Sequence, residues 1–456
     1  MPGCDGFRRS LLTDRRGLLR VGMLGASGLT LAGLLRHEAA RADSPARRKN
    51  SVIILWMRGG PSQLETWDMK PNAPVEIRGE FSPIDTSVPG IQICEHLPRS
   101  AKIMDKWSII RSMHFREEDG RTDHSTGDQV CFTGHPFGPV PDVNVAPSIG
   151  SQVKRQLQAD NPQMPAYVMI PRHVPGTSPA YLGSRWDAFE THADPASSAP
   201  FSVPNLRLAD AAAGARMPDR RALLENLDGL NRRAANAEMK AVDEFHHQAA
   251  ELLTGTAVQT AFDLDQEPAE VRQRYGFHGQ YRSRVRAGGD APNWPQRMLL
   301  ARRLVEAGAR LVTVDCRWWD THEDNFWSLQ NGFLPRWDQA YSALIEDLAN
   351  RGLLETTLVV GWGEMGRTPR INAAAGRDHW SQVMNVAVAG GGTRGGRVIG
   401  SSDRQGAVPH DNPKIVQDML ATMYRHLGIN TANETVDHAG RPHPLLPCGR
   451  PIEELF

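Results

Sequence analysis

The stretch WDQAYSALIEDLANRGLLETTLVVGW (residues 337–362) places a helix directly before a buried strand. Its large apolar residues recur at helical spacing: Tyr341, Leu344, Ile345 and Leu348. Gly352 can end this helix, and the strand predicted at 356–362 holds consecutive apolar residues rather than alternating ones. Strands of that kind are typical of sheets that are covered on both faces. The stretch therefore predicts one helix–strand unit of an α/β fold.

The same order recurs along the chain. A helix predicted at 292–308 leads into a strand at 309–315, and a strand at 385–391 precedes an amphipathic helix at 412–429. Continuous apolar runs predict three further strands, at 51–57, 106–113 and 164–170. Helix–strand alternation with such strands predicts a mainly parallel central sheet with helices on both faces.

Residues 43–456 are predicted to form a single domain. Residues 172–217 are rich in Pro, Ala, Ser and Gly and show little periodicity, whereas 218–255 have helical composition. We therefore expect an irregular and helical insertion at 172–290 within this domain.

The first 42 residues are typical of an export signal. Arg15-Arg16 begin a twin-arginine pattern, an apolar run follows at 21–35, and Ala40-Arg41-Ala42 offers a cleavage site. The alternative is a basic amphipathic helix that the mature protein retains. We expect export through the twin-arginine pathway to the periplasm or the extracellular space. The mature chain holds no apolar run that is long enough to span a bilayer.

Composition restricts the partners and the type of metal site. The chain carries 52 basic and 52 acidic side chains, so nucleic-acid binding has no overall electrostatic support. Cysteines 94, 131, 316 and 448 lie far apart and form no C-x-x-C motif, which argues against a thiolate zinc site. One or two disulfides among them stay open.

Polar side chains gather at the ends of the predicted strands, where α/β sheets bind their ligands. The four clusters are RTDHSTGDQ (121–129), VDCRWWDTHEDN (314–325), Glu364 with Arg367, and Asp378-His379. Their Asp and His side chains suit Zn²⁺, Mn²⁺ or Fe. Each cluster alone also fits a helix cap, a turn or a structural hydrogen bond. Together they predict one shared site.

Hydroxyl and guanidinium groups accompany these clusters. Ser125 and Thr126 could supply a nucleophile that a nearby metal ion activates, or they could simply belong to a polar turn. Arg367, Arg370 and Arg377 could bind an anionic ester through bidentate hydrogen bonds, or they could pair with nearby carboxylates.

Several motifs carry a resemblance to a known family. They are GGPSQLETWDMKPNAP (59–74), VPGIQICEHLP (88–98), RSMHFREEDGRTDHSTGDQVCFTG (111–134), WWDTHEDN (318–325), GEMGRTPRI (363–371), GRDHW (376–380) and VIGSSD (398–403). The chain resembles the domain of unknown function 1501 family, exported sulfatase-like relatives within the alkaline phosphatase superfamily. The resemblance implies an alkaline-phosphatase-like α/β fold and metal-dependent hydrolysis of phosphate or sulfate esters.

The resemblance also implies roles for individual residues. It implies that Asp320, His322, Glu364 and His379 hold one divalent ion (Zn, Mn, Ca or Fe) and that Ser125 or Thr126 lies near the nucleophile. From the residues themselves we expect Asp378, beside His379, to join the ligands, and Arg367 to act in catalysis with Ser125 and Thr126. Two positions depart from the superfamily pattern: Arg58 follows the first strand where an acidic ligand is usual, and Met365 replaces a histidine. The absence of C-x-P-x-R argues against a formylglycine nucleophile. These residues are compatible with one ion or none.

These features predict an exported metal-dependent hydrolase. Its substrate would be a small-molecule or polysaccharide anionic ester of phosphate, phosphonate or sulfate. One alternative is a non-catalytic binding or scaffold protein on the same fold with an altered metal site. Another is a carbohydrate-binding surface protein, because several of the 11 tryptophans lie near the polar clusters.

Overall fold

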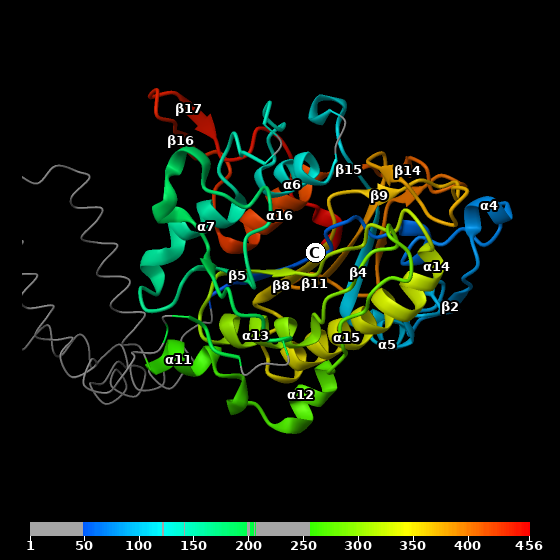
Figure 1. Ribbon diagram of the computed structural model, residues 1–456. Helices are drawn as coiled ribbons and strands as arrows, with labels where there is room; N and C mark the ends of the chain where they lie inside the picture. Colours follow the sequence, from blue (N-terminus) through cyan, green and yellow to red (C-terminus); the bar gives the residue numbers. More distant parts are fainter. Residues whose placement is uncertain (1–48, 121–122, 141, 198–200, 205, 207–255) are drawn as a thin grey trace, which may run out of the picture. The chain divides into compact units, whose positions relative to one another are not determined.

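A nine-stranded sheet forms the centre of the fold (Figure 1). The computed structural model describes residues 49–120, 123–140, 142–197, 201–204, 206 and 256–456. Residues 50–456 pack as one unit. The predicted export signal (1–42) and the predicted helix at 218–255 lie outside the described residues.

The strands of this sheet follow the order β12-β4-β11-β8-β1-β7-β5-β6, and β15 pairs with β4. Their bounds are β1 (Ser51–Trp56), β4 (Trp107–His114), β5 (Tyr167–Ile170), β6 (Phe189–Glu190), β7 (Leu311–Asp315), β8 (Thr357–Trp362), β11 (Met384–Gly390), β12 (Val398–Ile399) and β15 (Lys414–Ile415). Every predicted strand is present, within three residues of its expected ends. β6 lies in a segment that the sequence indicated to be irregular, yet it pairs in parallel with β5 at one edge of the sheet.

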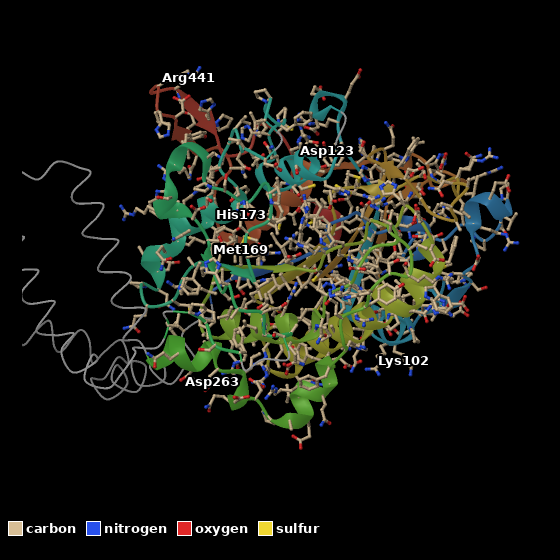
Figure 2. The ribbon with its side chains drawn as sticks, in the orientation of Figure 1. Lys102, Asp123, Met169, His173, Asp263 and Arg441 are labelled. Atoms are coloured by element: carbon tan, nitrogen blue, oxygen red, sulfur yellow. The ribbon has the colours of Figure 1, made fainter. Side chains whose placement is uncertain are left out.

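Helices cover both faces of the sheet (Figure 1). α13 (Pro295–Glu306) and α15 (Leu334–Asn350) pack on one face, and α6 (His124–Thr133), α7 (Ile149–Leu157) and α16 (Val416–Leu427) pack on the other. Successive residues of β1 alternate between the two cores: Ile53 joins the first, and Val52 and Ile54 join the second. Side chains fill the space between the sheet and both helical layers (Figure 2). The α/β fold class is therefore confirmed.

Shorter elements surround this core. The other α-helices within the described residues are α4 (Val75–Arg78), α5 (Pro98–Lys102), α11 (Thr256–Phe262), α12 (Ala269–Tyr275) and α14 (Asn325–Ser328). The two-stranded ribbons are β2 (Pro83–Asp85) with β3 (Gln92–Cys94), β9 (Gly366–Arg367) with β10 (His379–Trp380), β13 (Ser401–Ser402) with β14 (Pro409–Asp411), and β16 (Glu434–Val436) with β17 (Pro442–Pro444). No helix in the described part of the chain combines the length and apolar character that crossing a membrane requires. The four described cysteines are unpaired, so the disulfides left open above do not form among them.

One edge of the sheet brings distant segments together. β1 is parallel to both β7 and β8, so the chain leaves all three strands at the same edge. β11 runs antiparallel to β8 and to β4. β4 therefore also ends at this edge, and β11 begins there. The segments after β1, β4, β7 and β8 consequently meet the segment before β11.

Candidate active site

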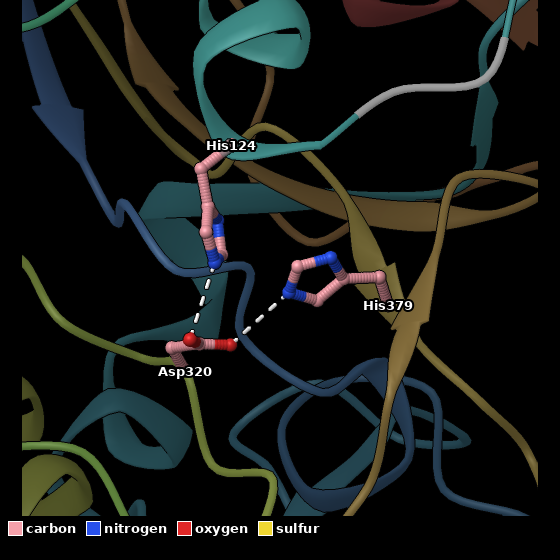
Figure 3. Close-up of side chains that lie close together, drawn as sticks. All are labelled: His124, Asp320 and His379. Atoms are coloured by element: carbon pink, nitrogen blue, oxygen red, sulfur yellow. Dashed lines mark hydrogen bonds and ion pairs between the residues drawn. The ribbon is translucent and has the colours of Figure 1, made fainter. Parts of the chain in front are cut away.

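Three imidazoles converge on one carboxylate at this edge of the sheet. The Nε2 atom of His124 lies 3.2 Å from Asp320 Oδ2. The Nε2 atoms of His322 and His379 lie 3.0 and 3.3 Å from Asp320 Oδ1. Figure 3 shows His124 and His379 approaching Asp320 from two different segments. One ligand atom each from His124, Asp320 and His379 fits within a mutual distance of 4.8 Å.

Local structure fixes two of the three imidazoles. His124 is the first residue of α6, where the N-cap residue Asp123, labelled in Figure 2, accepts a 3.0 Å hydrogen bond from the Thr126 amide. His379 belongs to β10, which pairs with β9 so that His379 lies opposite Arg367. The cluster therefore rests on a capped helix and a paired ribbon.

Two further carboxylates orient the imidazoles from behind. The Oε1 atom of Glu364 lies 2.5 Å from His124 Nδ1, and an oxygen of Asp378 lies 2.7 Å from His322 Nδ1. Glu364 is fully buried and also accepts a 2.7 Å hydrogen bond from the Gly59 amide. A carboxylate on Nδ1 turns Nε2 toward the ligand side, an arrangement that is common around metal-binding histidines.

The donor set fits a divalent ion. Zn–N distances are about 2.0–2.1 Å, so two ligands of a tetrahedral ion lie roughly 3.3 Å apart. The contacts of 3.0–3.3 Å around Asp320 match that separation. The buried Nε2 atom of His124 makes no well-formed hydrogen bond to any described residue, and neither does Glu364 Oε2. Imidazole with carboxylate is also a donor set that Zn²⁺, Mn²⁺ and Fe accept.

The electrostatics of the cluster favour protons where no ion is bound. Burial lowers the pKa of His124, but Asp320 and Glu364 outweigh burial and raise the pKa to about 9. Burial likewise raises the pKa of Asp320, yet the three imidazoles and Arg367 hold it far below its usual range. A metal ion that binds here must displace a proton from His124.

Arg367 holds the site together rather than facing solvent. Its side chain is fully buried and donates hydrogen bonds of 2.6 Å to Asp320 Oδ1 and 2.9 Å to the Gly60 carbonyl, with a further contact to the Gly59 carbonyl. This geometry makes Arg367 a positioning residue for Asp320.

The other two arginines lie apart from the cluster. Arg377 forms a fully buried ion pair with Glu65, a carboxylate that lies far away in the sequence. Arg370 is exposed.

The two candidate hydroxyls differ in availability. Thr126 is buried, and its Oγ1 atom accepts a 2.8 Å hydrogen bond from the Asp123 amide within the helix cap. Ser125 is half-exposed and directly follows His124. Of the two, Ser125 has the hydroxyl that is not tied into the cap.

The structure brings all five predicted ligands to one place, in different relations to the cluster. Asp320 and His379 belong, with His124, to the group whose ligand atoms are spaced closely enough to hold a metal ion. His322 contacts Asp320. Glu364 and Asp378 contact imidazoles instead. Their roles as ligands stay predictions. His124 was missing from the predicted ligands, although it lies in a polar cluster just after a predicted strand.

Comparisons with known proteins identify one family. The family model described as "Protein of unknown function (DUF1501)" matches residues 49–456. No curated protein matches the chain in sequence.

Among solved structures, the chain is similar to the PsFucS1 sulfatase from Pseudoalteromonas sp., with 11% identity, a TM-score of 0.36, and coverage of 86% of this chain and 70% of the sulfatase. It is similar to the lipoteichoic acid synthase LtaP from Listeria monocytogenes, with 10% identity, a TM-score of 0.35, and coverage of 85% and 74%. The phosphonate monoester hydrolase SpPMH from Silicibacter pomeroyi gives 11% identity, a TM-score of 0.36, and coverage of 89% and 76%. Alignments this loose transfer neither an activity nor residue roles.

Proposed function

The chain belongs to the DUF1501 family of proteins of unknown function, and from this premise we propose that it is an exported, metal-dependent hydrolase of phosphate or sulfate esters. The observation that carries the proposal is the convergence of three imidazole Nε2 atoms on Asp320. Export rests on the sequence of the first 42 residues alone.

Access from solvent supports a catalytic rather than a purely structural site. The side chains of Asp320 and His379 keep 30% and 31% of their surface exposed, and that of His124 keeps 20%. Structural metal sites are usually closed by protein ligands, whereas catalytic sites leave a position open. A small ester can therefore reach the cluster.

The residues divide into distinct roles. His124, Asp320 and His379 would hold the ion, while Glu364 and Arg367 fix His124 and Asp320 in place. An ion bound there would supply Lewis acidity to an ester oxygen. Ser125 is the candidate nucleophile because this half-exposed residue directly follows His124.

One observation favours a second candidate function. The Arg367 guanidinium lies 2.6 Å from Asp320 Oδ1. The negative charge of this carboxylate is therefore already paired with a cation when no metal is bound. A chain that kept the cluster as a hydrogen-bonded network would bind a ligand without hydrolysing it.

Metal content separates these two functions. We would measure it by elemental mass spectrometry on protein purified without chelator, and repeat the measurement on the Asp320→Ala/His379→Ala variant. The matched control is Asp437→Ala/His443→Ala, which removes another His–carboxylate pair, 3.0 Å apart, at the β16–β17 ribbon.

We expect about one ion per chain, lost in the cluster variant and kept in the control. The metal-loaded protein should then hydrolyse at least one of the p-nitrophenyl phosphate, phosphonate and sulfate esters. A folded wild type without bound metal would contradict the hydrolase proposal and leave the binding protein.

A further inference from the structure

Arg58 follows β1 and is held in a fixed position near the cluster. Its Nε atom donates a 2.6 Å hydrogen bond to Asp128 Oδ2. Asp128 is fully buried and also accepts a 2.9 Å hydrogen bond from Trp56 Nε1. Because Asp128 lies four residues after His124 in α6, it occupies the same side of the helix one turn further on. This anchor brings the Arg58 guanidinium to the His124 side of the sheet edge.

The outer end of the Arg58 guanidinium donates no hydrogen bond to any described residue, although the side chain is only 6% exposed. The group lies 4.5 Å from the ring centre of Trp318, and that ring lies 6.4 Å from the His124 ring. Trp318 therefore lies close to both the Arg58 guanidinium and His124, and it covers one side of the guanidinium.

These features match the requirements of an oxyanion site. A guanidinium that is tied through Nε keeps two parallel N–H donors on Nη1 and Nη2, which fit two oxygens of a phosphate or sulfate. Burial beside an indole strengthens such hydrogen bonds, because less water competes for the donors. Aspartate or glutamate at position 58 would repel the same anion.

We propose that Arg58 binds the tetrahedral oxyanion of the substrate, a phosphate or sulfate group, beside the cluster of His124, Asp320 and His379. This assignment rests on the proposed hydrolase only in treating that oxyanion as part of an ester that is cleaved there. This assignment gives a function to Arg58, which stands where an acidic metal ligand is usual in the superfamily.

The test is calorimetric titration with inorganic phosphate and with sulfate. Arg58→Lys keeps the positive charge next to Asp128 but removes the two-donor fork. The matched control is Arg284→Lys, because Arg284 also lies over a tryptophan, 4.1 Å from the Trp327 ring centre, but is exposed and paired with Asp324. We expect Arg58→Lys to bind both anions at least roughly tenfold more weakly than the wild type, and Arg284→Lys to bind them unchanged.

A second variant protects the test against misfolding. Arg58→Gln/Asp128→Asn removes both charges, so no buried carboxylate is left unpaired, and it should lose anion binding while its circular dichroism spectrum is preserved. The assignment would be overturned if Arg58→Lys bound phosphate and sulfate within twofold of the wild-type affinity. It would also be overturned if the wild type bound neither anion at millimolar concentrations.

The same titration on chelator-treated protein separates the two proposals. Arg58-dependent anion binding in a protein that holds no metal and turns over no ester would support the oxyanion site and contradict the hydrolase. Metal binding and turnover that do not depend on Arg58 would support the hydrolase and overturn the oxyanion site.

Discussion

Replacing Glu364 by glutamine should weaken metal binding far more at high pH than at neutral pH. Glu364 contacts His124 Nδ1 at 2.5 Å and is itself fixed by the Gly59 amide. Its carboxylate therefore does two opposing things. It orients His124 as a ligand, and it also favours the proton that competes with the ion for His124 Nε2.

The magnitudes follow from the geometry and the pKa of His124. Loss of a carboxylate that orients a metal-binding histidine typically weakens metal affinity about 10–100-fold. The pKa of His124 is raised to about 9. Protonation of His124 therefore lowers the apparent metal affinity roughly 100-fold at pH 7, but less than about twofold at pH 9.5. Glutamine carries no charge, so the pKa of His124 falls and proton competition at pH 7 weakens. The variant should bind zinc about 10–100-fold more weakly at pH 9.5, and the difference should shrink at pH 7.

The assay is competition with a chromophoric zinc chelator at both pH values. The control is Glu95→Gln, which removes a carboxylate that also accepts a backbone hydrogen bond, from the Ser82 amide at 2.8 Å, but lies outside the cluster. An NMR titration of His124 in the metal-free variant should show a pKa below about 9. Equal affinities at pH 9.5, or a ratio that does not change with pH, would refute the role given to Glu364.

Two predictions concern the frame of the site. Gly59→Ala should lower the free energy of unfolding in urea by several kcal/mol, and the variant should no longer bind metal. The reason is that Gly59 has a φ of +110° and that a Cβ there would lie 2.3 Å from the backbone nitrogen of Trp319. Gly183→Ala, with φ +85° and no atom within 4 Å, should cost only about 1–2 kcal/mol, and equal costs would contradict this account. Arg377→Met should cost about 3–5 kcal/mol because it leaves Glu65 buried and unpaired, and Arg377→Met/Glu65→Leu should recover most of that loss in the same denaturation assay. A loss below about 1 kcal/mol in the single variant would show that this pair is not needed for folding.

Local sequence patterns were sufficient for the elements of the sheet but not for their directions. Continuous apolar runs identify buried strands whichever way they run. β11 proved antiparallel to both of its neighbours, and no local feature of 384–390 indicates this. The direction matters for function, because it places the start of β11 at the edge where β8 ends. His379 reaches the cluster for that reason, because it lies in the segment just before β11.

Residue roles depended on partners that lie far away in sequence. His124 contacts Glu364 across 240 positions, and Arg58 contacts Asp128 across 70 positions. The sequence placed His124 within a polar cluster but could not tell whether its ring would face a metal, a nucleophile or a turn. In the sequence Arg58 only interrupts the pattern of a metal site, because its anchor on α6 is a tertiary contact.

The charges that follow β8 have a structural reason. Glu364 and Arg367 are both fully buried, and the turn after β1 forms hydrogen bonds to both of them. The Gly59 amide donates to Glu364, while the Gly59 and Gly60 carbonyls accept from Arg367. One glycine turn therefore fixes an acid that orients His124 and a base that positions Asp320, before any ligand arrives. These contacts fix His124 and Asp320 before any ligand arrives, and they preorganise the site for the ion and the anionic ester that we propose.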